Sequence, residues 1–231
     1  MRKASFLFVP LLLVLACRAQ AQIVTGAAAT SNVSANGIDN SVTLTIPTPA
    51  PHLDNAEGIV NIVLNSDTAC GTIVAPSGWV SVLNTNTTGG NLCSRIYERV
   101  LTASESSGTS YTFSWTGTTT YTAKLLFLEN MSGVDSSSGA GSYGTSWSAP
   151  QVGTNSGGEY LLAFFMNSSN ASWTAPKQMT VVERNTTGGY SDLLTQAWQE
   201  SKGPTLSFEA SSDGGGQWGI AQLVAFRPSN G

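Results

Sequence analysis

The sequence predicts an all-β protein, a jelly-roll-like antiparallel β-sandwich of about ten to eleven strands with an internal two-fold pseudo-repeat. Short runs rich in Val, Ile, Thr, Tyr, Phe and Trp alternate with Gly, Ser, Asn and Pro clusters, at spacings of about 10 to 15 residues. Almost no segment has helical periodicity. Two stretches read nearly alike, APSGWVSVLNTNTTGG from Ala75 and APKQMTVVERNTTGG from Ala175.

The N-terminal segment has the features of a secretory signal. Arg2 and Lys3 precede an uncharged apolar run over 4–16, and Ala19-Gln20-Ala21 is a small-residue cleavage site before Gln22. The apolar run is too short to span a bilayer comfortably, and no other stretch is long and apolar enough, so we expect no transmembrane segment. A secreted or cell-surface protein is expected.

A lipid anchor at Cys17 is left open but not favoured. Val14-Leu15-Ala16-Cys17 loosely resembles a bacterial lipoprotein box. Leu15 stands where a smaller residue is usual, and the later cleavage site is the cleaner one.

The mature chain is expected to be acidic. The full sequence has a net charge of −4, and loss of Arg2, Lys3 and Arg18 with the signal leaves 7 of the 10 Lys and Arg against 14 Asp and Glu, about −7. No basic stripe remains, so nucleic acid and anionic membranes are poor partners. A weakly charged surface rich in hydroxyl and amide groups suits a polysaccharide or another surface protein.

Cys70 and Cys93 are the only cysteines outside the signal. An even pair in an exported chain predicts a disulfide, which would contribute roughly 3 kcal/mol by closing a loop of about 24 residues. The alternatives are two unpaired buried thiols or metal ligands, and a single His in the whole chain disfavours a Cys–His metal site.

Eleven strands are expected from composition and alternation. They lie at 41–46, 58–65, 79–84, 95–102, 111–115, 120–129, 159–166, 179–184, 193–200, 205–210 and 217–226. The runs at 58–65 and 159–166 are nearly continuously apolar, as expected of strands covered on both faces. The Gly/Ser-rich stretch 136–148 is expected to be a loop between packed parts.

Five strands of the first unit match five of the second in order and spacing, which gives pseudo-repeats over about 57–133 and 158–231. Each unit alone would bury only a thin core, and no Pro-rich or charged linker separates them. We therefore assign 1–21 to the signal, 22–39 to an N-terminal extension and 40–228 to one β-sandwich domain, with two small domains as the alternative. We interpret the repeated Asn-Thr-Thr-Gly-Gly element as a hairpin turn rather than a ligand loop.

The motifs GIVNIVLN, APSGWVSV, RIYERVLT, YTFSWTG, LLFLENMSGVD, EYLLAFFMN and QLVAFRP together resemble a recurrent bacterial and phage extracellular domain. The match covers roughly 40–228. Its relatives are similar to jelly-roll sandwiches in surface, filament or tail-associated proteins, mostly without assigned activity. The resemblance therefore implies fold and location and carries over no catalytic residue, and Cys70 and Cys93 are not part of its pattern.

No catalytic constellation stands out, and we expect no enzymatic activity. The only His, His52, lies in a Pro-rich connection, and no Gly-x-Ser-x-Gly elbow precedes a helix. Acidic residues such as Glu57, Glu98 and Glu159 lie on strand runs without a cleft signature for glycoside hydrolysis. Glu57 and Glu159 occupy equivalent strand starts, which favours a structural role.

No cofactor is expected, although a structural calcium ion is left open. Asp39, Asp54 and Asp213 lie beside Asn or Gly in loops and supply the oxygen ligands that calcium prefers. None of these loops matches an EF-hand, and turn chemistry explains them equally well.

Aromatic residues supply the candidate ligand-binding site. Trp79, Trp115 and Trp218 lie in strand runs and are expected in the core. Tyr143 and Trp147 lie in the Gly/Ser-rich stretch, and Trp173 precedes the second Ala-Pro element. Two functions follow: a non-catalytic structural or adhesive sandwich, and as the alternative a carbohydrate-binding module that uses these three aromatics, Tyr143, Trp147 and Trp173.

Overall fold

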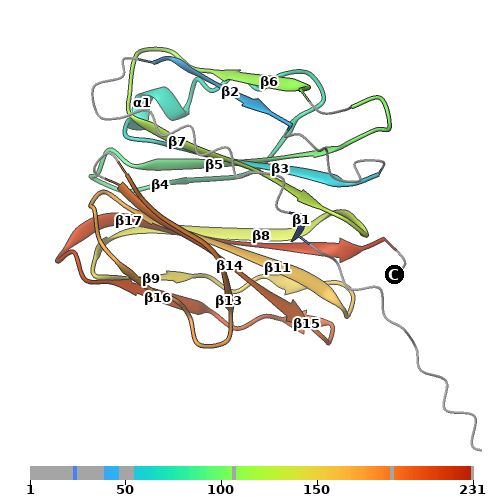
Figure 1. The fold of residues 1–231 in the computed structure, drawn as a ribbon. Helices are drawn as coiled ribbons and strands as arrows, with labels where there is room; N and C mark the ends of the chain where they lie inside the picture. Colours follow the sequence, from blue (N-terminus) through green and yellow to red (C-terminus); the bar gives the residue numbers. More distant parts are fainter. Residues whose placement is uncertain (1–22, 25–38, 47–54, 106–107, 188–189, 230–231) are drawn as a thin grey trace, which may run out of the picture.

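The protein is a stack of antiparallel β-sheets. The computed structural model describes residues 23–24, 39–46, 55–105, 108–187 and 190–229, which lie in four layers (Figure 1). The two middle layers are five-stranded sheets packed face to face, and a smaller sheet covers the outer side of each. The described residues thus form the all-β, antiparallel sandwich-like fold that the sequence predicts.

The first half of the chain forms the upper two layers of Figure 1. Its elements are β1 (Ile23–Val24), β2 (Ser41–Thr45), β3 (Glu57–Leu64), α1 (Asp67–Cys70), β4 (Val80–Asn86), β5 (Cys93–Val100), β6 (Ser110–Ser114) and β7 (Tyr121–Leu128). The middle sheet has the order β1-β7-β3-β5-β4, and β2 pairs with β6 in the outer sheet.

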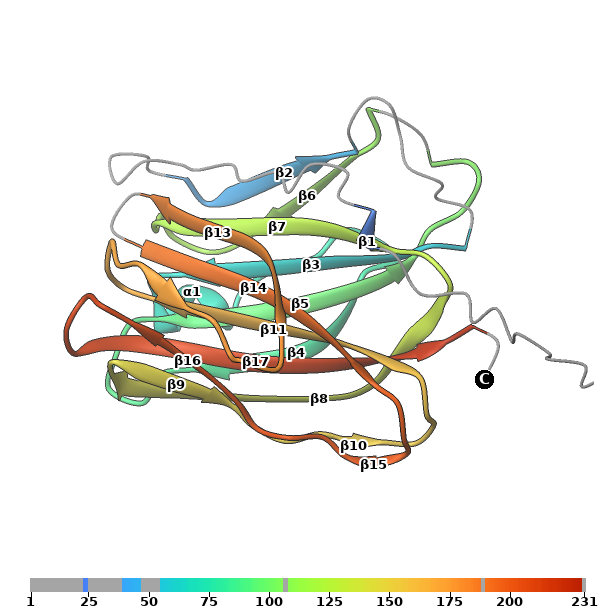
Figure 2. The same ribbon diagram turned by 60° about the horizontal axis from the view of Figure 1, so that its bottom comes forward.

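The second half forms the lower layers. Its strands are β8 (Met131–Gly144), β9 (Ser146–Ala149), β10 (Gly153–Thr154), β11 (Glu159–Asn167), β12 (Trp173–Thr174), β13 (Thr180–Thr187), β14 (Tyr190–Gln199), β15 (Gly203–Pro204), β16 (Phe208–Ser212) and β17 (Gln217–Pro228). The middle sheet has the order β13-β14-β11-β17-β8 and the outer sheet β12-β16-β9. Figure 2 shows β10 and β15 as a separate two-stranded ribbon. Each of the eleven predicted ranges overlaps one of the strands of the two halves.

The two halves share their strand order and a local irregularity. The first middle sheet, counted from its β4 edge, has the order β4-β5-β3-β7. The second, counted from its β13 edge, has the corresponding order β13-β14-β11-β17. The register of β4 on β5 shifts between Ser81 and Leu83, and that of β13 on β14 shifts between Val181 and Glu183. Each edge strand therefore carries a bulge at the same place, three residues after its turn closes. The turns are alike as well: an amide donates to a proline carbonyl in Trp79–Pro76 (3.2 Å) and Met179–Pro176 (3.1 Å).

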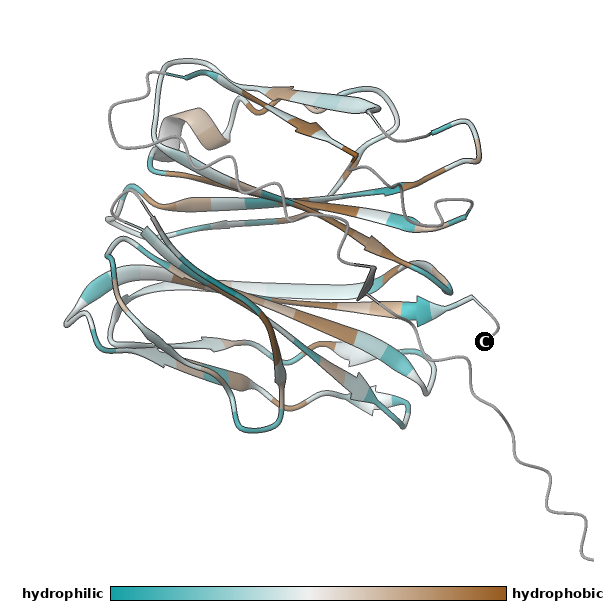
Figure 3. Ribbon diagram, viewed as in Figure 1, coloured by the Kyte–Doolittle hydropathy of each residue, from teal (hydrophilic) through white to brown (hydrophobic). Residues whose placement is uncertain are grey.

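Hydrophobic side chains fill the three spaces between the four layers. In Figure 3 the strands of the middle sheets include long apolar stretches. β3 and β11, at the centres of the middle sheets, are buried along their whole length. Both faces of these strands are covered, which explains their continuous apolar sequence. The central space holds Ile59, Leu126, Leu162, Phe164 and Phe226, each at most 3% exposed.

The Gly/Ser-rich stretch 136–148 is strand rather than the expected loop. Its residues belong to β8, which pairs with β17, and to β9, which pairs with β16. The small side chains let β4 of the other half approach closely. A Cβ at Gly139 would lie 2.2 Å from Oγ1 of Thr85, and one at Gly141 would lie 2.7 Å from the carbonyl oxygen of Asn86. The composition that indicated a loop thus reflects close strand packing.

Two groups of polar side chains are buried in the central space, one on each side. Oγ of Ser94 on β5 donates to Oε1 of Gln222 on β17 at 2.7 Å. The ammonium group of Lys124 on β7 contacts the carboxylate of Asp192 on β14. β5 of the first half corresponds to β14 of the second, and β7 corresponds to β17. The Ser94–Gln222 and Lys124–Asp192 contacts therefore join equivalent pairs of strands. Each crosses from one middle sheet to the other.

The predicted disulfide joins Cys70 at the end of α1 to Cys93 at the start of β5, with the two Cα atoms 6.2 Å apart. It ties the helix to the middle sheet of the first half. The predicted signal, 1–21, and the anchor candidate Cys17 lie outside the described residues. In the described part of the chain, no helix has the length and apolar character needed to cross a membrane.

The contact between β8 and β4 predicts which glycines tolerate a side chain. Gly141→Ala should lower the free energy of unfolding by about 1–3 kcal/mol, because the methyl group meets backbone that cannot move aside. Gly153→Ala is the matched control, since nothing lies within 4 Å of its Cβ position. Urea denaturation of both variants measures the difference, and equal stability of the two would contradict the packing account.

Candidate functional site

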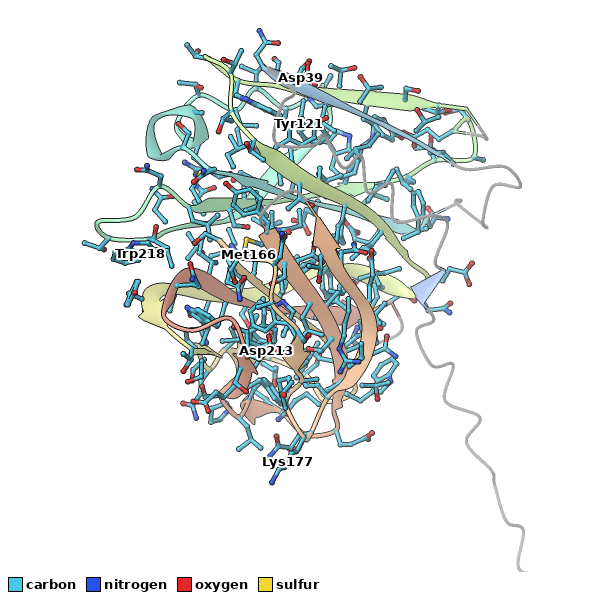
Figure 4. All side chains as sticks on the ribbon, turned by 60° about the vertical axis from the view of Figure 1, so that its left-hand side comes forward. Asp39, Tyr121, Met166, Lys177, Asp213 and Trp218 are labelled. Carbon is cyan, nitrogen blue, oxygen red and sulfur yellow. A yellow bond between two sulfur atoms is a disulfide. The ribbon has the colours of Figure 1, made fainter. Side chains whose placement is uncertain are left out.

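One end of the molecule presents an aromatic pair. Tyr143 near the end of β8 stands directly opposite Trp218 near the start of β17. Their rings meet edge to face, with centroids 5.4 Å apart and planes at 71°. Tyr143 is 62% exposed, Trp218 is partly exposed, and Figure 4 places Trp218 at the margin of the molecule where the two halves meet. The pair is therefore open to a ligand.

Trp218 lies against the Asn-Thr-Thr-Gly-Gly turn of the first half. A Cβ at Gly90 would lie 2.6 Å from Cδ2 of the indole, so only glycine allows this contact. Gly89 has a φ of +83°, a conformation that glycine adopts without strain. Hydrogen bonds between Thr87 and Leu92 hold the turn closed, including amide to carbonyl at 2.9 Å. The repeated turn thus also positions the aromatic ring.

A cavity of about 210 Å³ opens beside the indole. It is lined by Asn65, Gly89, Gly90, Asn91, Leu92, Ser168 and Trp218. Ser168 is fixed by its amide, which donates to the Trp218 carbonyl at 3.0 Å. The lining includes amide and hydroxyl groups and no ionisable side chain. An aromatic face beside neutral hydrogen-bonding groups suits a polyhydroxylated, uncharged ligand.

The three predicted ligand-binding aromatics do not lie together. Tyr143 belongs to the exposed pair, whereas Trp147 and Trp173 are 2% and 6% exposed and pack against each other with centroids 5.4 Å apart. Nε1 of Trp147 donates to the Ser142 carbonyl at 3.0 Å, and its ring covers Gly219. Both tryptophans lie in the core between β9, β16 and the second middle sheet. Trp218, expected in the core, takes their place at the surface.

The two candidate calcium ligands that the structure describes, Asp39 and Asp213, are separated. Asp39 lies at the top of Figure 4 and Asp213 in the lower half, and Asp54 falls outside the described residues. Oδ1 of Asp213 accepts from the Ser172 amide at 2.7 Å, as a turn-stabilising carboxylate does. Within the described ranges, no group of three His, Cys, Asp or Glu side chains is placed to hold a metal ion. His52 also lies outside those ranges.

A second cavity, of about 400 Å³, lies at the opposite ends of β3 and β17. Glu57, Glu98, Arg99, Val134 and Arg227 are among its lining residues. Glu57 is 1% exposed, and Oε2 of Glu98 accepts from the Val134 amide at 3.0 Å. Burial and, to a lesser degree, the Glu98 carboxylate raise the pKa of Glu57 from 4.5 to about 7. Glu57 is therefore partly protonated near neutral pH.

Glu159 does not share this environment, although it too begins a strand. Glu57 pairs with Leu128 on β7, and Tyr160 pairs with Phe226 on β17. Because Leu128 and Phe226 hold corresponding positions in the two halves, Tyr160 is the counterpart of Glu57. The expected equivalence of the two glutamates is thus wrong by one residue, which places them on opposite sheet faces. Burial raises the pKa of Glu159, opposed by hydrogen bonds from Ser156.

Comparisons with protein-family models, with curated proteins and with solved structures find no significant match.

The raised pKa of Glu57 predicts a pH-dependent stability. A folded pKa above the unfolded value gives stability that is full below about pH 4.5 and is lost as pH rises through about 7. Between about pH 5 and pH 8, the wild type should lose roughly 1–2 kcal/mol relative to Glu57→Gln, allowing for solvent screening at the open cavity. Urea unfolding of both proteins at each pH measures the difference.

Glu209→Gln, at an exposed position on β16, is the control and should follow the wild type at both pH values. A Glu57→Gln protein that lost stability in parallel with the wild type would show that Glu57 has an ordinary pKa.

Proposed function

We propose that this protein is a non-catalytic, secreted or cell-surface adhesive β-sandwich that binds carbohydrate at the Tyr143–Trp218 surface. The observation that carries the proposal is the exposed edge-to-face ring pair beside a neutral, amide- and hydroxyl-lined cavity. Aromatic rings offer an apolar platform to the C–H faces of a sugar, and neighbouring polar groups can bond its hydroxyls.

Electrostatics supports an uncharged glycan. The cavity lining has no ionisable side chain, and only 10% of the whole chain is charged. The net negative charge disfavours polyanionic partners such as nucleic acids.

Extracellular location is part of the proposal. The signal-like N-terminus, the cysteine pair and the resemblance to bacterial and phage surface domains support it. Attachment through an acylated Cys17 is a variant of the same function, in which the adhesive surface is tethered rather than released.

The absence of catalysis is also proposed. The cavity lining at the aromatic surface holds no carboxyl, imidazole, amine or thiol group, so the Ser168 hydroxyl has no general base beside it there. The carboxyl pair Glu57 and Glu98 lies at the other end of β3, and at 1% exposure Glu57 offers little of its carboxyl group to a glycosidic oxygen. Both observations favour binding over hydrolysis.

Titration with a panel of bacterial and plant polysaccharides tests this function. A saturable change in tryptophan fluorescence is expected. In isothermal titration calorimetry, which needs no indole reporter, Trp218→Ala and Tyr143→Ala should each weaken binding about tenfold or more, as loss of a stacking ring does. Leu206→Ala, at an exposed apolar residue away from the cavity lining, is the matched control and should bind like the wild type.

The same samples are assayed for released reducing ends. Release would overturn the non-catalytic assignment. Binding that survives both aromatic substitutions would place the site elsewhere, and silence across the panel would favour another surface protein as partner.

A further inference from the structure

A lysine and two carboxylates meet in the central space between the middle sheets. Nζ of Lys124, on β7, contacts Oδ1 of Asp192, on β14. The same nitrogen lies 3.2 Å from Oε2 of Glu183, on the neighbouring strand β13. The side chains of Lys124 and Asp192 are 4% and 9% exposed, and that of Glu183 is 21% exposed.

The three residues come from both halves. In the first half, the bulge position that corresponds to Glu183 holds Leu83, which is partly buried and packs against the apolar core. A glutamate at this position is therefore not required by packing. Nδ2 of Asn185 donates to Oε1 of Glu183, which leaves Oε2 directed at the amine.

An ion pair alone is a weak explanation for this burial. Removing two charges from water is costly, and their mutual attraction often fails to offset that cost. Burial raises the pKa of Asp192, Lys124 opposes that rise and Glu183 adds to it. The protonated carboxylic acid form of Asp192 is thus more accessible here than in water.

We propose that Lys124 and Asp192 form an intramolecular amide bond, with Glu183 as the catalytic proton carrier. The lone pair of neutral Nζ attacks Cγ of the protonated Asp192 carboxyl, and the C–N bond forms. Glu183 accepts a proton from Nζ and delivers it to the departing carboxyl oxygen. The C–O bond breaks and one water leaves, so Glu183 returns to its starting state and no oxidant, reductant or co-reactant is needed.

The pseudo-equivalent position supplies an internal comparison. There Gln222 and Ser94 cross the same interface, with neither an amine nor a carboxylate. The proposal therefore allows one cross-link, between β7 and β14, joining residues 68 apart in sequence and linking the two halves covalently.

Mass spectrometry of the folded, purified full chain tests the proposal after reduction of the disulfide. The intact mass should be one water molecule lower than the mass calculated for the chain as purified, counted from residue 22 where the signal has been removed. Trypsin should then fail to cut after Lys124 and yield a branched peptide that joins 100–177 to 185–202. An intact mass that matches the sequence, with cleavage after Lys124, would overturn the proposal. A branch to 178–184 would overturn the assignment of Asp192, because that peptide contains Glu183.

Variants separate the roles of the three residues. Lys124→Arg keeps the positive charge and should restore the full mass. Glu183→Gln keeps both reacting groups, so a folded protein of full mass would identify the proton carrier, and complete cross-linking in it would exclude that role. Lys177→Arg, at an exposed lysine, is the matched control and should lose one water like the wild type.

Discussion

Burial of the facing surfaces of the two middle sheets is the constraint on which the molecule depends. β3 and β11 are apolar on both faces, so an outer sheet can cover only one face of each. The remaining faces, with side chains such as Ile59 and Phe164, cover each other. Each such side chain contributes about 1.5–3 kcal/mol when fully buried, and either half alone would expose a whole sheet of them. The two halves therefore fold as partners.

Close approach of the middle sheets explains why small and polar residues occur at positions in the interface. β8 is small-residue-rich because β4 of the other half lies against Gly139 and Gly141. Polar side chains enter the interface only where they find partners, as Gln222 does with Ser94. Where the interface opens at its two ends, it leaves the cavities beside Trp218 and Glu57.

The sequence could predict the strands but not their stacking. Each predicted strand has a counterpart because alternation and β-branched composition are local signals. β8 was not predicted, because its glycines and serines are required by close packing against β4, which is distant in the sequence. The same reason applies to the site: Tyr143 was predicted, but Trp147 is covered and Trp218 uncovered by residues that no periodicity identifies. Position in a strand gave no signal either, since Trp147 and Trp173 also stand at strand starts and are buried.

The aromatic surface and the buried lysine both depend on the docking of the two halves. Trp218 belongs to the second half, while Gly90 beneath it and Asn65 beside it belong to the first, so the cavity exists only while the halves stay docked. A force that pulled the two halves apart would open this cavity. A covalent bond between Lys124 and Asp192 would hold β7 and β14 together against that separation without adding bulk to the core. The proposed cross-link and the proposed binding surface thus involve the same interface between the halves. Each rests on its own residues, so each is tested separately.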